Sequence, residues 1–311
     1  MFELLWEIPL LFFRIALAYV ESLVRLLVPP GRKNVDGQVV LITGAGHGIG
    51  RCLAIEFAKL GAHLVLWDID ETGVVETADE LRGIGARVTT YTVDVSKKDN
   101  VRSVAERVKQ EIGDVDILVN NAGITNGLEL LKLSDSQIER LMDVNIMAHF
   151  WTVRAFLPAM LERQHGHIVS IASVAGKRGT GKLVDYSASK FAVVGFTEAL
   201  AMEIREMKIS GVYTTTVMPF FVDTEMIRNP IPRIRFPRLH PILKPESVAS
   251  EIVDGVLRNK VEVMIPSSLK YGIAIKNPFV PRKVLLLLED FLDFGVEAKD
   301  KDLTADKDKD A

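Results

Sequence analysis

Short runs of β-branched and apolar residues alternate with stretches of helical periodicity between Val39 and Ile265. The runs predict strands at 39–43, 63–68, 88–93, 117–120, 166–171, 212–218 and 261–265. The stretches predict helices at 49–60, 72–84, 99–112, 135–157, 186–207 and 245–258. Because a helix separates each strand from the next, the strands are expected to run parallel, with helices on both faces. The pattern predicts an α/β fold: a single doubly wound Rossmann domain with a seven-stranded parallel sheet, over residues 37–266.

Three segments depart from this alternation. Residues 219–245 are rich in proline, and a connection of that length in a compact domain is typical of a lid or binding loop. We expect its apolar side chains to face a lipophilic ligand: Phe220, Phe221, Met226, Ile231, Ile234 and Phe236. Residues 267–296 contain an amphipathic stretch, which fits a membrane contact, a partner helix or a lid over the substrate mouth. Residues 297–311 are strongly charged and predict a disordered tail.

The first 30 residues are apolar apart from a few charges at regular spacing. On a helix these charges fall within about 40° of one another, which makes one narrow polar stripe: Glu3, Glu7, Arg14, Glu21 and Arg25. A signal peptide is disfavoured because the segment begins with acids, and a spanning helix because a central arginine costs roughly 2.5 to 3.5 kcal/mol. A helix packed on the protein or on a second subunit is a further alternative. We expect residues 1–30 to form an amphipathic helix that anchors the protein in a membrane or lipid-droplet surface.

Composition excludes several other classes of function. With 311 residues and a formal charge of only −3, the chain has no basic excess that would indicate a nucleic-acid partner. The single cysteine, Cys52, cannot form an internal disulfide, and its apolar neighbours favour a buried structural thiol. The histidines lack metal-ligand spacing, so we expect no metal site.

A glycine-rich loop follows the first predicted strand and precedes the first helix of the domain. It reads TGAGHGIG and contains Gly44, Gly46, Gly48 and Gly50. Such glycines let the backbone approach a pyrophosphate, which then lies at the positive end of the following helix. Strand, glycines and helix in this order predict a dinucleotide site.

Two carboxylates follow the next two strands. Asp68 lies about 18 residues beyond Gly50, where a carboxylate would bond the adenosine ribose and repel a 2′-phosphate, so we predict NAD as the cofactor. His47 and Arg51 could lie near such a phosphate and leave NADP as the alternative. Asp94 could hold the adenine or simply belong to a helix N-cap.

Tyr186 begins a predicted helix, and Lys190 follows one turn later on the same face. A phenol has a pKa near ~10, and a neighbouring ammonium is expected to lower that pKa and make Tyr186 a proton acceptor. Lys190 could also bond the nicotinamide ribose. Ser173 follows the fifth strand at the carboxyl edge of the sheet, where its hydroxyl can hold a substrate oxygen. A tyrosine and a lysine at this spacing are common on helix surfaces. Their occurrence in a chain that also carries a glycine-rich dinucleotide loop is what favours a catalytic role.

From Gly37 to Pro266 the chain resembles the short-chain dehydrogenase/reductase family. The shared motifs are TGxxxGxG at 43–50, NNAG at 120–123, a helical Asn145, Ser173 and YxxxK. The resemblance implies that Tyr186 is the acid/base, that Lys190 lowers its pKa, that Ser173 orients the substrate hydroxyl and that Asn145 supports a proton-relay water. It implies cofactor contacts from Thr43, Gly44, Gly46, His47, Gly48, Ile49, Gly50, Asp68, Asp94, Asn121, Ala122, Gly123, Tyr186, Lys190, Pro219, Val222 and Thr224. The family's usual Pro-Gly after the sixth strand is Pro219-Phe220 here, which leaves the backbone contacts of that loop open.

More narrowly, stretches such as LVLWDID and HGHIVSIASVAG are similar to the subgroup of 17-beta-hydroxysteroid dehydrogenases types 11 and 13 and epidermal retinol dehydrogenases. This resemblance implies NAD-linked oxidation of retinol or of a 17-beta-hydroxysteroid by a homodimer, at the cytosolic face of the endoplasmic reticulum membrane or on lipid droplets. Two alternatives remain. One is an NADPH-linked reductase of another lipid carbonyl, and the other is a lipid-droplet scaffold that retains a dehydrogenase core.

Overall fold

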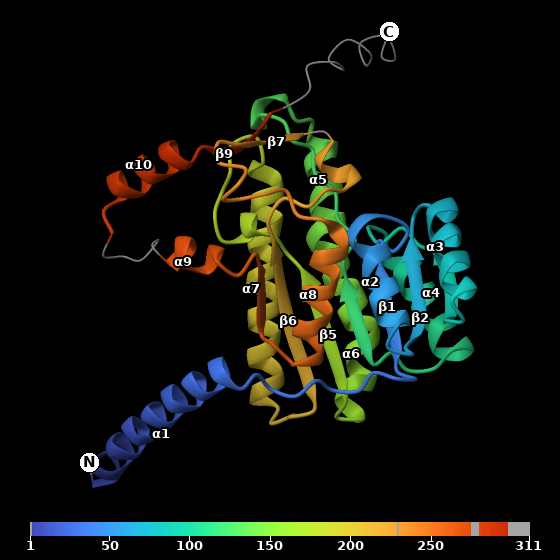
Figure 1. Ribbon diagram of the computed structural model, residues 1–311. Helices are drawn as coiled ribbons and strands as arrows, with labels where there is room; N and C mark the ends of the chain where they lie inside the picture. The colour runs from blue at the N-terminus through green and yellow to red at the C-terminus, as the bar shows by residue number, and fades with distance from the viewer. Residues whose placement is uncertain (1, 229, 275–279, 298–311) are drawn as a thin grey trace. The chain divides into compact units, whose positions relative to one another are not determined.

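The computed structural model describes residues 2–228, 230–274 and 280–297. It divides into two units, an N-terminal segment that ends at Asn34 and a domain that begins at Val35 (Figure 1). Each unit is described by itself below.

The domain is built on a seven-stranded sheet in which every pair of neighbouring strands is parallel. Its strands are β1 (Val39–Thr43), β2 (His63–Asp68), β3 (Arg87–Thr92), β4 (Ile117–Asn120), β5 (Gly166–Ile171), β6 (Val212–Pro219) and β8 (Glu262–Ile265). They lie in the order β3-β2-β1-β4-β5-β6-β8. The predicted seven-stranded doubly wound sheet is confirmed.

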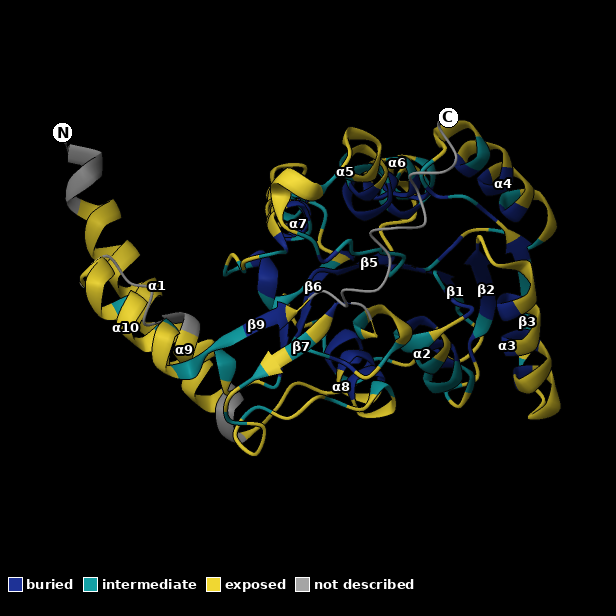
Figure 2. Ribbon diagram, turned by 90° about the horizontal axis from the view of Figure 1, so that it is seen from above, coloured by how far each residue is buried: buried dark blue, intermediate teal, exposed yellow. Residues whose placement is uncertain are grey.

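Helices cover both faces of this sheet (Figure 2). On one face lie α2 (Gly48–Ala58), α3 (Glu71–Gly83) and α8 (Pro245–Leu257), and on the other lie α4 (Lys98–Glu111), α6 (Ala148–Glu162) and α7 (Val184–Glu206). Successive strand side chains point to opposite faces, so Ile42 joins the first layer and Leu41 the second. Both are fully buried. This two-sided burial explains why the central strands β1 and β4 are almost uniformly apolar.

The predicted helix at 135–157 is not continuous. The structure divides it into α5 (Asp135–Met142), a π-helical turn η2 (Asp143–Met147) and α6. Ser134 caps α5, because its hydroxyl accepts a hydrogen bond from the Gln137 backbone N–H. Turns of π-helix are frequent at functional sites, and this one carries Asn145.

The lid segment and the C-terminal segment form a second, two-stranded sheet. Strand β7 (Ile231–Ile234) pairs antiparallel with β9 (Phe294–Glu297), and the guanidinium of Arg233 lies 2.8 Å from the Asp293 carboxylate. Short elements complete the domain: η1 (Leu130–Lys132), η3 (Val174–Gly176), η4 (Glu225–Ile227), α9 (Leu269–Ala274) and α10 (Arg282–Leu292). The loop predicted at 219–245 is therefore partly strand. Of the tail predicted at 297–311, only Glu297 falls within the described residues.

The N-terminal unit contains one helix, α1 (Phe2–Leu27), as predicted, with Pro9 inside it. All side chains from 6 to 24 are exposed, including large apolar ones such as Trp6, Phe12 and Phe13. Among the helices in the described parts of the chain, none has the length and apolar character needed to cross a bilayer.

Candidate functional site

A cavity of about 740 Å³ opens at the carboxyl ends of the strands, where ligands bind in folds of this kind. Most of the side chains and glycines that the sequence indicates come together on its wall. They are Gly44, His47, Gly48, Ile49, Asp68, Asp94, Asn121, Ala122, Gly123, Ser173, Tyr186, Lys190, Pro219, Val222 and Thr224. The nucleotide loop and the catalytic candidates therefore share one cavity.

The other four predicted residues, Thr43, Gly46, Gly50 and Asn145, do not line the cavity. Thr43 lies behind its wall, and its hydroxyl accepts hydrogen bonds from the backbone N–H groups of Asn121 (3.0 Å) and Ala122 (3.1 Å). Asn121 returns two bonds from its amide to the carbonyl oxygens of Thr43 (2.9 Å) and Gly44 (3.0 Å). These bonds hold the loop after β1 against the loop after β4.

The glycine loop owes its shape to two positions in particular. Gly44 has φ +65°, in the left-handed region, and a Cβ there would lie 2.9 Å from the Ala122 Cα. At Gly50 a Cβ would collide with the Gly44 carbonyl oxygen and lie 2.6 Å from the Asn121 side-chain nitrogen. Only glycine lets α2 begin this close to the end of β1.

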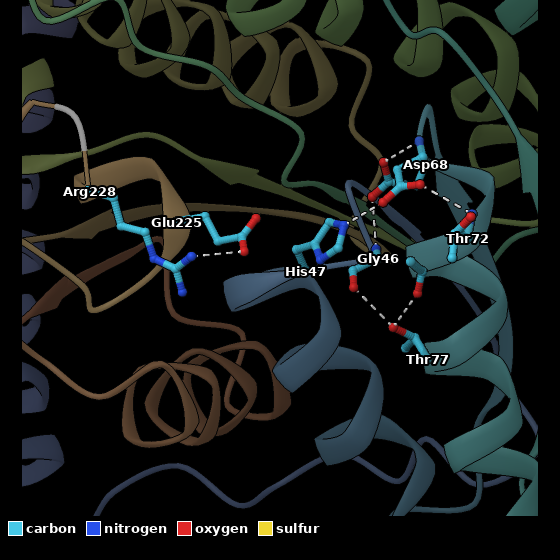
Figure 3. Close-up of polar contacts among 9 residues, drawn as sticks. Gly46, His47, Asp68, Thr72, Thr77, Glu225 and Arg228 are labelled. Carbon is cyan, nitrogen blue, oxygen red and sulfur yellow. Dashed lines mark hydrogen bonds and ion pairs between the residues drawn. The ribbon is translucent and has the colours of Figure 1, made fainter. Parts of the chain in front are cut away.

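Asp68 lies at the end of β2, beside Gly46 of the glycine loop (Figure 3). One carboxylate oxygen accepts a hydrogen bond from the Gly46 N–H (2.8 Å), and the other accepts one from the Asp70 N–H (3.0 Å). These bonds fix the carboxylate at the cavity wall and leave lone pairs for ligand hydroxyls.

The two side chains that the sequence analysis placed near a 2′-phosphate, His47 and Arg51, both contact acidic side chains. His47 Nε2 lies 2.7 Å from an Asp70 carboxylate oxygen, and this hydrogen bond lowers the pKa of Asp70. Arg51 donates two bonds to Glu80, which raise the pKa of its guanidinium. Neither side chain can meet a 2′-phosphate without giving up its contact with a carboxylate.

Asp94 lies on the cavity wall after β3, and one carboxylate oxygen accepts from the Ser96 N–H (3.0 Å) and hydroxyl (2.6 Å). Helix α4 begins at Lys98, with Lys97 as its N-cap residue, so Asp94 is not the cap itself. Asp94 thus remains available for the adenine contact that the sequence analysis considered.

Tyr186 and Lys190 lie one turn apart in α7 as predicted, and Ser173 faces them from the turn after β5. The Lys190 ammonium donates to the Ile171 carbonyl oxygen (2.9 Å) and lies 5.6 Å from the centre of the Tyr186 ring. The Ser173 hydroxyl accepts from the Ala175 N–H (3.1 Å) and donates to the Pro219 carbonyl oxygen (3.5 Å). The three functional groups meet at one part of the wall.

The predicted lowering of the Tyr186 pKa by Lys190 does not occur in this structure. Burial raises the pKa of Tyr186 because it disfavours the phenolate, and the hydrogen bond with Ser173 opposes this only in part. Burial also lowers the pKa of Lys190 to about 8, since Lys190 is only 3% exposed. The phenol is therefore protonated at neutral pH in the chain by itself.

Asn145 reaches the site through the backbone of the loop after β4. Its side-chain oxygen accepts from the Ile124 N–H (2.8 Å), and its amide donates to the Ile124 carbonyl oxygen (2.9 Å) and to the Ser189 hydroxyl (3.1 Å). The side chain is fully buried. Asn145 thus links the π-helical turn, the wall segment at Ile124 and helix α7, which makes it a positioning residue here.

The outer part of the cavity includes residues that the sequence analysis missed. Of the apolar residues predicted in the segment 219–245, Phe220, Phe221 and Met226 line the cavity. Ile231 and Ile234 do not line it, because they form β7. Phe236 does not line it either, and its ring packs against that of Phe291, with 5.3 Å between ring centres. The C-terminal segment supplies Leu285, Leu288, Glu289, Leu292, Phe294 and Val296. The structure shows that this segment forms part of the wall of the cavity. The sequence signal that could have indicated this wall is the helical spacing of Leu285, Leu288 and Leu292.

The lowered pKa of Lys190 predicts a pH-dependent stability. Between pH 8 and 10.5 the folded chain binds fewer protons at Lys190 than the unfolded chain, so the free energy of unfolding rises with pH. We expect a rise of about 2 kcal/mol from pH 7.5 to 9.5, relative to Lys190→Met, in urea denaturation. Lys98→Met, at an exposed position, should retain the rise. Parallel pH profiles for wild type and Lys190→Met would contradict the prediction.

Comparison with known proteins places this site in a family. Residues 38–233 match the family model described as short chain dehydrogenase. Human estradiol 17-beta-dehydrogenase 11 is 45% identical over 287 residues, which cover 92% of this chain and 94% of that protein. Human 17-beta-hydroxysteroid dehydrogenase 13 is 42% identical over 296 residues, which cover 95% of this chain and 97% of that protein.

Solved structures agree. A short-chain dehydrogenase/reductase from Burkholderia phymatum in complex with NAD has a TM-score of 0.71 and 30% identity, covering 80% of this chain and 98% of that one. A metagenomic short-chain oxidoreductase in complex with NADP has a TM-score of 0.63 and 28% identity, covering 75% and 97%. The chain therefore belongs to the short-chain dehydrogenase/reductase family and is an oxidoreductase related to the 17-beta-hydroxysteroid dehydrogenases.

Proposed function

We propose that this protein is an NAD-dependent dehydrogenase of a lipophilic alcohol, either a 17-beta-hydroxysteroid or retinol, and that it works at a membrane or lipid-droplet surface. One observation carries the catalytic part of the proposal. The hydroxyl groups of Tyr186 and Ser173 and the ammonium of Lys190 lie on the wall of the same cavity as the glycine loop. An alcohol bound in this cavity would lie next to Tyr186, the proposed proton acceptor, and next to a dinucleotide held by the glycine loop.

In the proposed reaction Ser173 holds the substrate hydroxyl and Tyr186 takes its proton. NAD bound at the glycine loop would supply the hydride acceptor. Lys190, with its ammonium beside the Tyr186 ring, is placed to bond the nicotinamide ribose. Asn145 holds the loop at Ile124 against helix α7 through hydrogen bonds to the Ile124 N–H and the Ser189 hydroxyl. Reduction of the ketone or aldehyde is the same path in reverse.

The preference for NAD rests on the charges beneath the glycine loop. The Asp68 carboxylate lies on the cavity wall where an adenosine ribose would bind, and it would repel a 2′-phosphate. The side chains that could offset this repulsion, His47 and Arg51, contact Asp70 and Glu80 instead. An NADPH-linked reductase is the alternative, and a related structure contains NADP.

The lipophilic substrate is supported by the lining of the outer cavity. Its wall there is made largely of aliphatic and aromatic side chains, among them Leu183, Phe220, Leu285 and Leu292. Relatives that cover almost the whole chain are named as steroid dehydrogenases. The predicted homodimer stays a prediction.

The membrane part of the proposal rests on α1. A helix with exposed apolar side chains over most of its circumference and one stripe of charges suits the interface between headgroups and acyl chains. Trp6 and Tyr19 are aromatic residues of the kind that favour this interface. We propose the cytosolic face of the endoplasmic reticulum or the lipid-droplet surface as its place in the cell.

The catalytic proposal is tested by incubating the membrane-bound protein with a panel of hydroxysteroids and retinol and recording NADH or NADPH formation. We expect turnover with NAD in preference to NADP. Tyr186→Phe should lower kcat at least about 100-fold while NADH still binds, because only the proton acceptor is lost. A Tyr186→Phe variant that keeps its cellular role would favour the scaffold alternative, and stronger binding of NADPH would overturn the cofactor assignment.

The nucleotide site is tested by Gly50→Ala. The added Cβ would collide with the Gly44 carbonyl, so we expect NADH binding, followed by its fluorescence, to weaken at least about tenfold. Gly83→Ala is the matched control, because a Cβ at Gly83 has no heavy atom within 4 Å and should leave the affinity unchanged. Equal affinities of both variants would place the dinucleotide elsewhere.

The role of α1 is tested by flotation with vesicles of phosphatidylcholine and phosphatidylserine. Deletion of residues 2–28 should abolish flotation, because the apolar face of the helix is removed. Glu7→Gln in the full chain keeps that face and should float like the wild type. If the deletion variant still floats, α1 is not the anchor.

A further inference from the structure

The backbone of Tyr186 is bonded to a side chain at each of its polar groups. Its N–H donates to the Asp185 carboxylate (2.8 Å), and its carbonyl oxygen accepts from the Ser189 hydroxyl (2.8 Å). The Ser189 hydroxyl in turn accepts from the Asn145 amide (3.1 Å). The start of α7 is therefore fixed by hydrogen bonds beyond those of the helix itself.

Both of these side-chain contacts lead to the loop after β4. Asn145 is bonded to the Ile124 backbone, and the second oxygen of Asp185 accepts from the Asn126 side-chain amide (2.7 Å). Ile124 follows the NNAG motif directly, and Asn126 comes two residues later. Asp185 thus joins the loop expected to contact the dinucleotide to Tyr186, along a path that does not include Asn145.

Asp185 takes the place of a helix cap. The N-cap residue of α7 is Leu183, whose side chain makes no capping bond. The first N–H groups of a helix have no partner within the helix, and Asp185 supplies one for Tyr186. The positive end of the helix favours a carboxylate at this buried position, where Asp185 is 5% exposed. Because Leu183 and Tyr186 line the cavity and Asp185 does not, Asp185 acts through Tyr186 and not on a ligand.

A carboxylate suits this position because it accepts through both of its oxygens at once. An asparagine at position 185 would offer one acceptor, and its NH₂ group would face the NH₂ group of Asn126. Turning the Asn126 amide over would place its oxygen beside the Gln137 carbonyl oxygen, to which the amide nitrogen now donates at 3.3 Å. Aspartate therefore satisfies the Tyr186 N–H and the Asn126 amide together, whereas asparagine does not.

We propose that Asp185 is a positioning residue for the reaction of this site. By bonding the Tyr186 N–H and the Asn126 amide, its carboxylate keeps the phenol at a fixed place relative to the dinucleotide loop. A displacement of the reacting groups by about 1 Å can lower a rate about 100-fold, so bonds behind the cavity wall can limit the rate. The inference rests on the proposed function and adds a residue on which the rate of that reaction depends.

The first test is Asp185→Ala in the full chain, with retinol or a 17-beta-hydroxysteroid, whichever the wild type oxidises with NAD. We expect kcat to fall about tenfold, while KM for the alcohol and Kd for NADH change less than about twofold, because the cavity wall is kept. Asp99→Ala, at an exposed acid in the first turn of α4, is the matched control and should leave all three constants unchanged. A wild-type kcat in Asp185→Ala, or a loss confined to KM and Kd, would overturn the proposal.

An exchange of the two side chains separates this specific contact from a general loss of structure. Asn126→Asp alone sets two carboxylates against each other, and we expect kcat to fall at least as far as in Asp185→Ala. Adding Asp185→Asn restores both bonds with reversed polarity, since the new amide can donate to the new carboxylate and its oxygen can accept from the Tyr186 N–H. The double variant should therefore recover part of kcat. Defects that simply add in the double variant would count against a direct contact between positions 126 and 185.

Hydrogen exchange of the Tyr186 amide, followed by mass spectrometry, tests the same contact without turnover. We expect exchange about tenfold faster in Asp185→Ala than in the wild type or Asp99→Ala, because the N–H loses its acceptor. If the wild type oxidises none of the alcohols, the proposed function fails and this exchange rate decides the inference: faster exchange supports it and equal exchange overturns it. Melting temperatures identify a variant that does not fold, and Asp185→Asn, with a kcat between those of the wild type and Asp185→Ala, then takes its place.

Discussion

The hydrogen bonds between the ends of β1 and β4 are the constraint on which the rest of the site depends. At this point the order of the strands reverses, so the chains leave the sheet toward opposite faces and a crevice opens between them. At the base of the crevice the Asn121 N–H donates to the Thr43 hydroxyl, and the Asn121 side-chain amide donates to the carbonyl oxygens of Thr43 and Gly44. With that base fixed, α2 can begin against the Gly44 carbonyl and point its N-terminus into the cavity. The glycine loop and the NNAG loop are both held at this junction.

Burial has opposite effects on the two neighbouring ionisable groups. It keeps Tyr186 protonated and lowers the pKa of Lys190 to about 8, so neither group is stabilised in its charged form by the surrounding chain. The Ile171 carbonyl holds the Lys190 ammonium, and the phenol has Ser173. A cationic partner in the crevice would change this balance. This arrangement suits a site in which the proton acceptor becomes effective only when an oxidised nicotinamide is present.

Much of the fold follows from the sequence because burial on both faces of the sheet leaves a clear pattern. Runs of β-branched and apolar residues between amphipathic helices predict all seven strands, and local motifs place Gly44, Tyr186 and Lys190 in one cavity. The π-helical turn at Asn145 has no such pattern, since one extra residue in a turn barely alters helical periodicity. Non-local pairings were also invisible. Arg51 in α2 forms an ion pair with Glu80 in α3, so its charge is already neutralised and is less available to a 2′-phosphate.

The same limit explains why the substrate wall could be predicted only in part. Periodicity indicates that α10 is amphipathic, but the partner of its apolar face is set by pairing between distant strands, β7 and β9. Leu285, Leu288 and Leu292 line the cavity, while Leu287 is 60% and Phe291 56% exposed. The apolar surface of α10 is thus wider than the cavity requires.

The attachment of this wall also bears on access to the site. Arg233 and Asp293 are both partly exposed, and such ion pairs contribute only about 0 to 1 kcal/mol each, so the attachment depends mainly on the pairing of β7 with β9 and on aromatic contacts. The ring of Phe294 joins Phe220 and His240 in one such contact. A ligand that packs against these rings would add to the contacts that hold the wall in place. Substrate binding and closure of the wall are therefore expected to stabilise each other, because both bury the same aromatic surface.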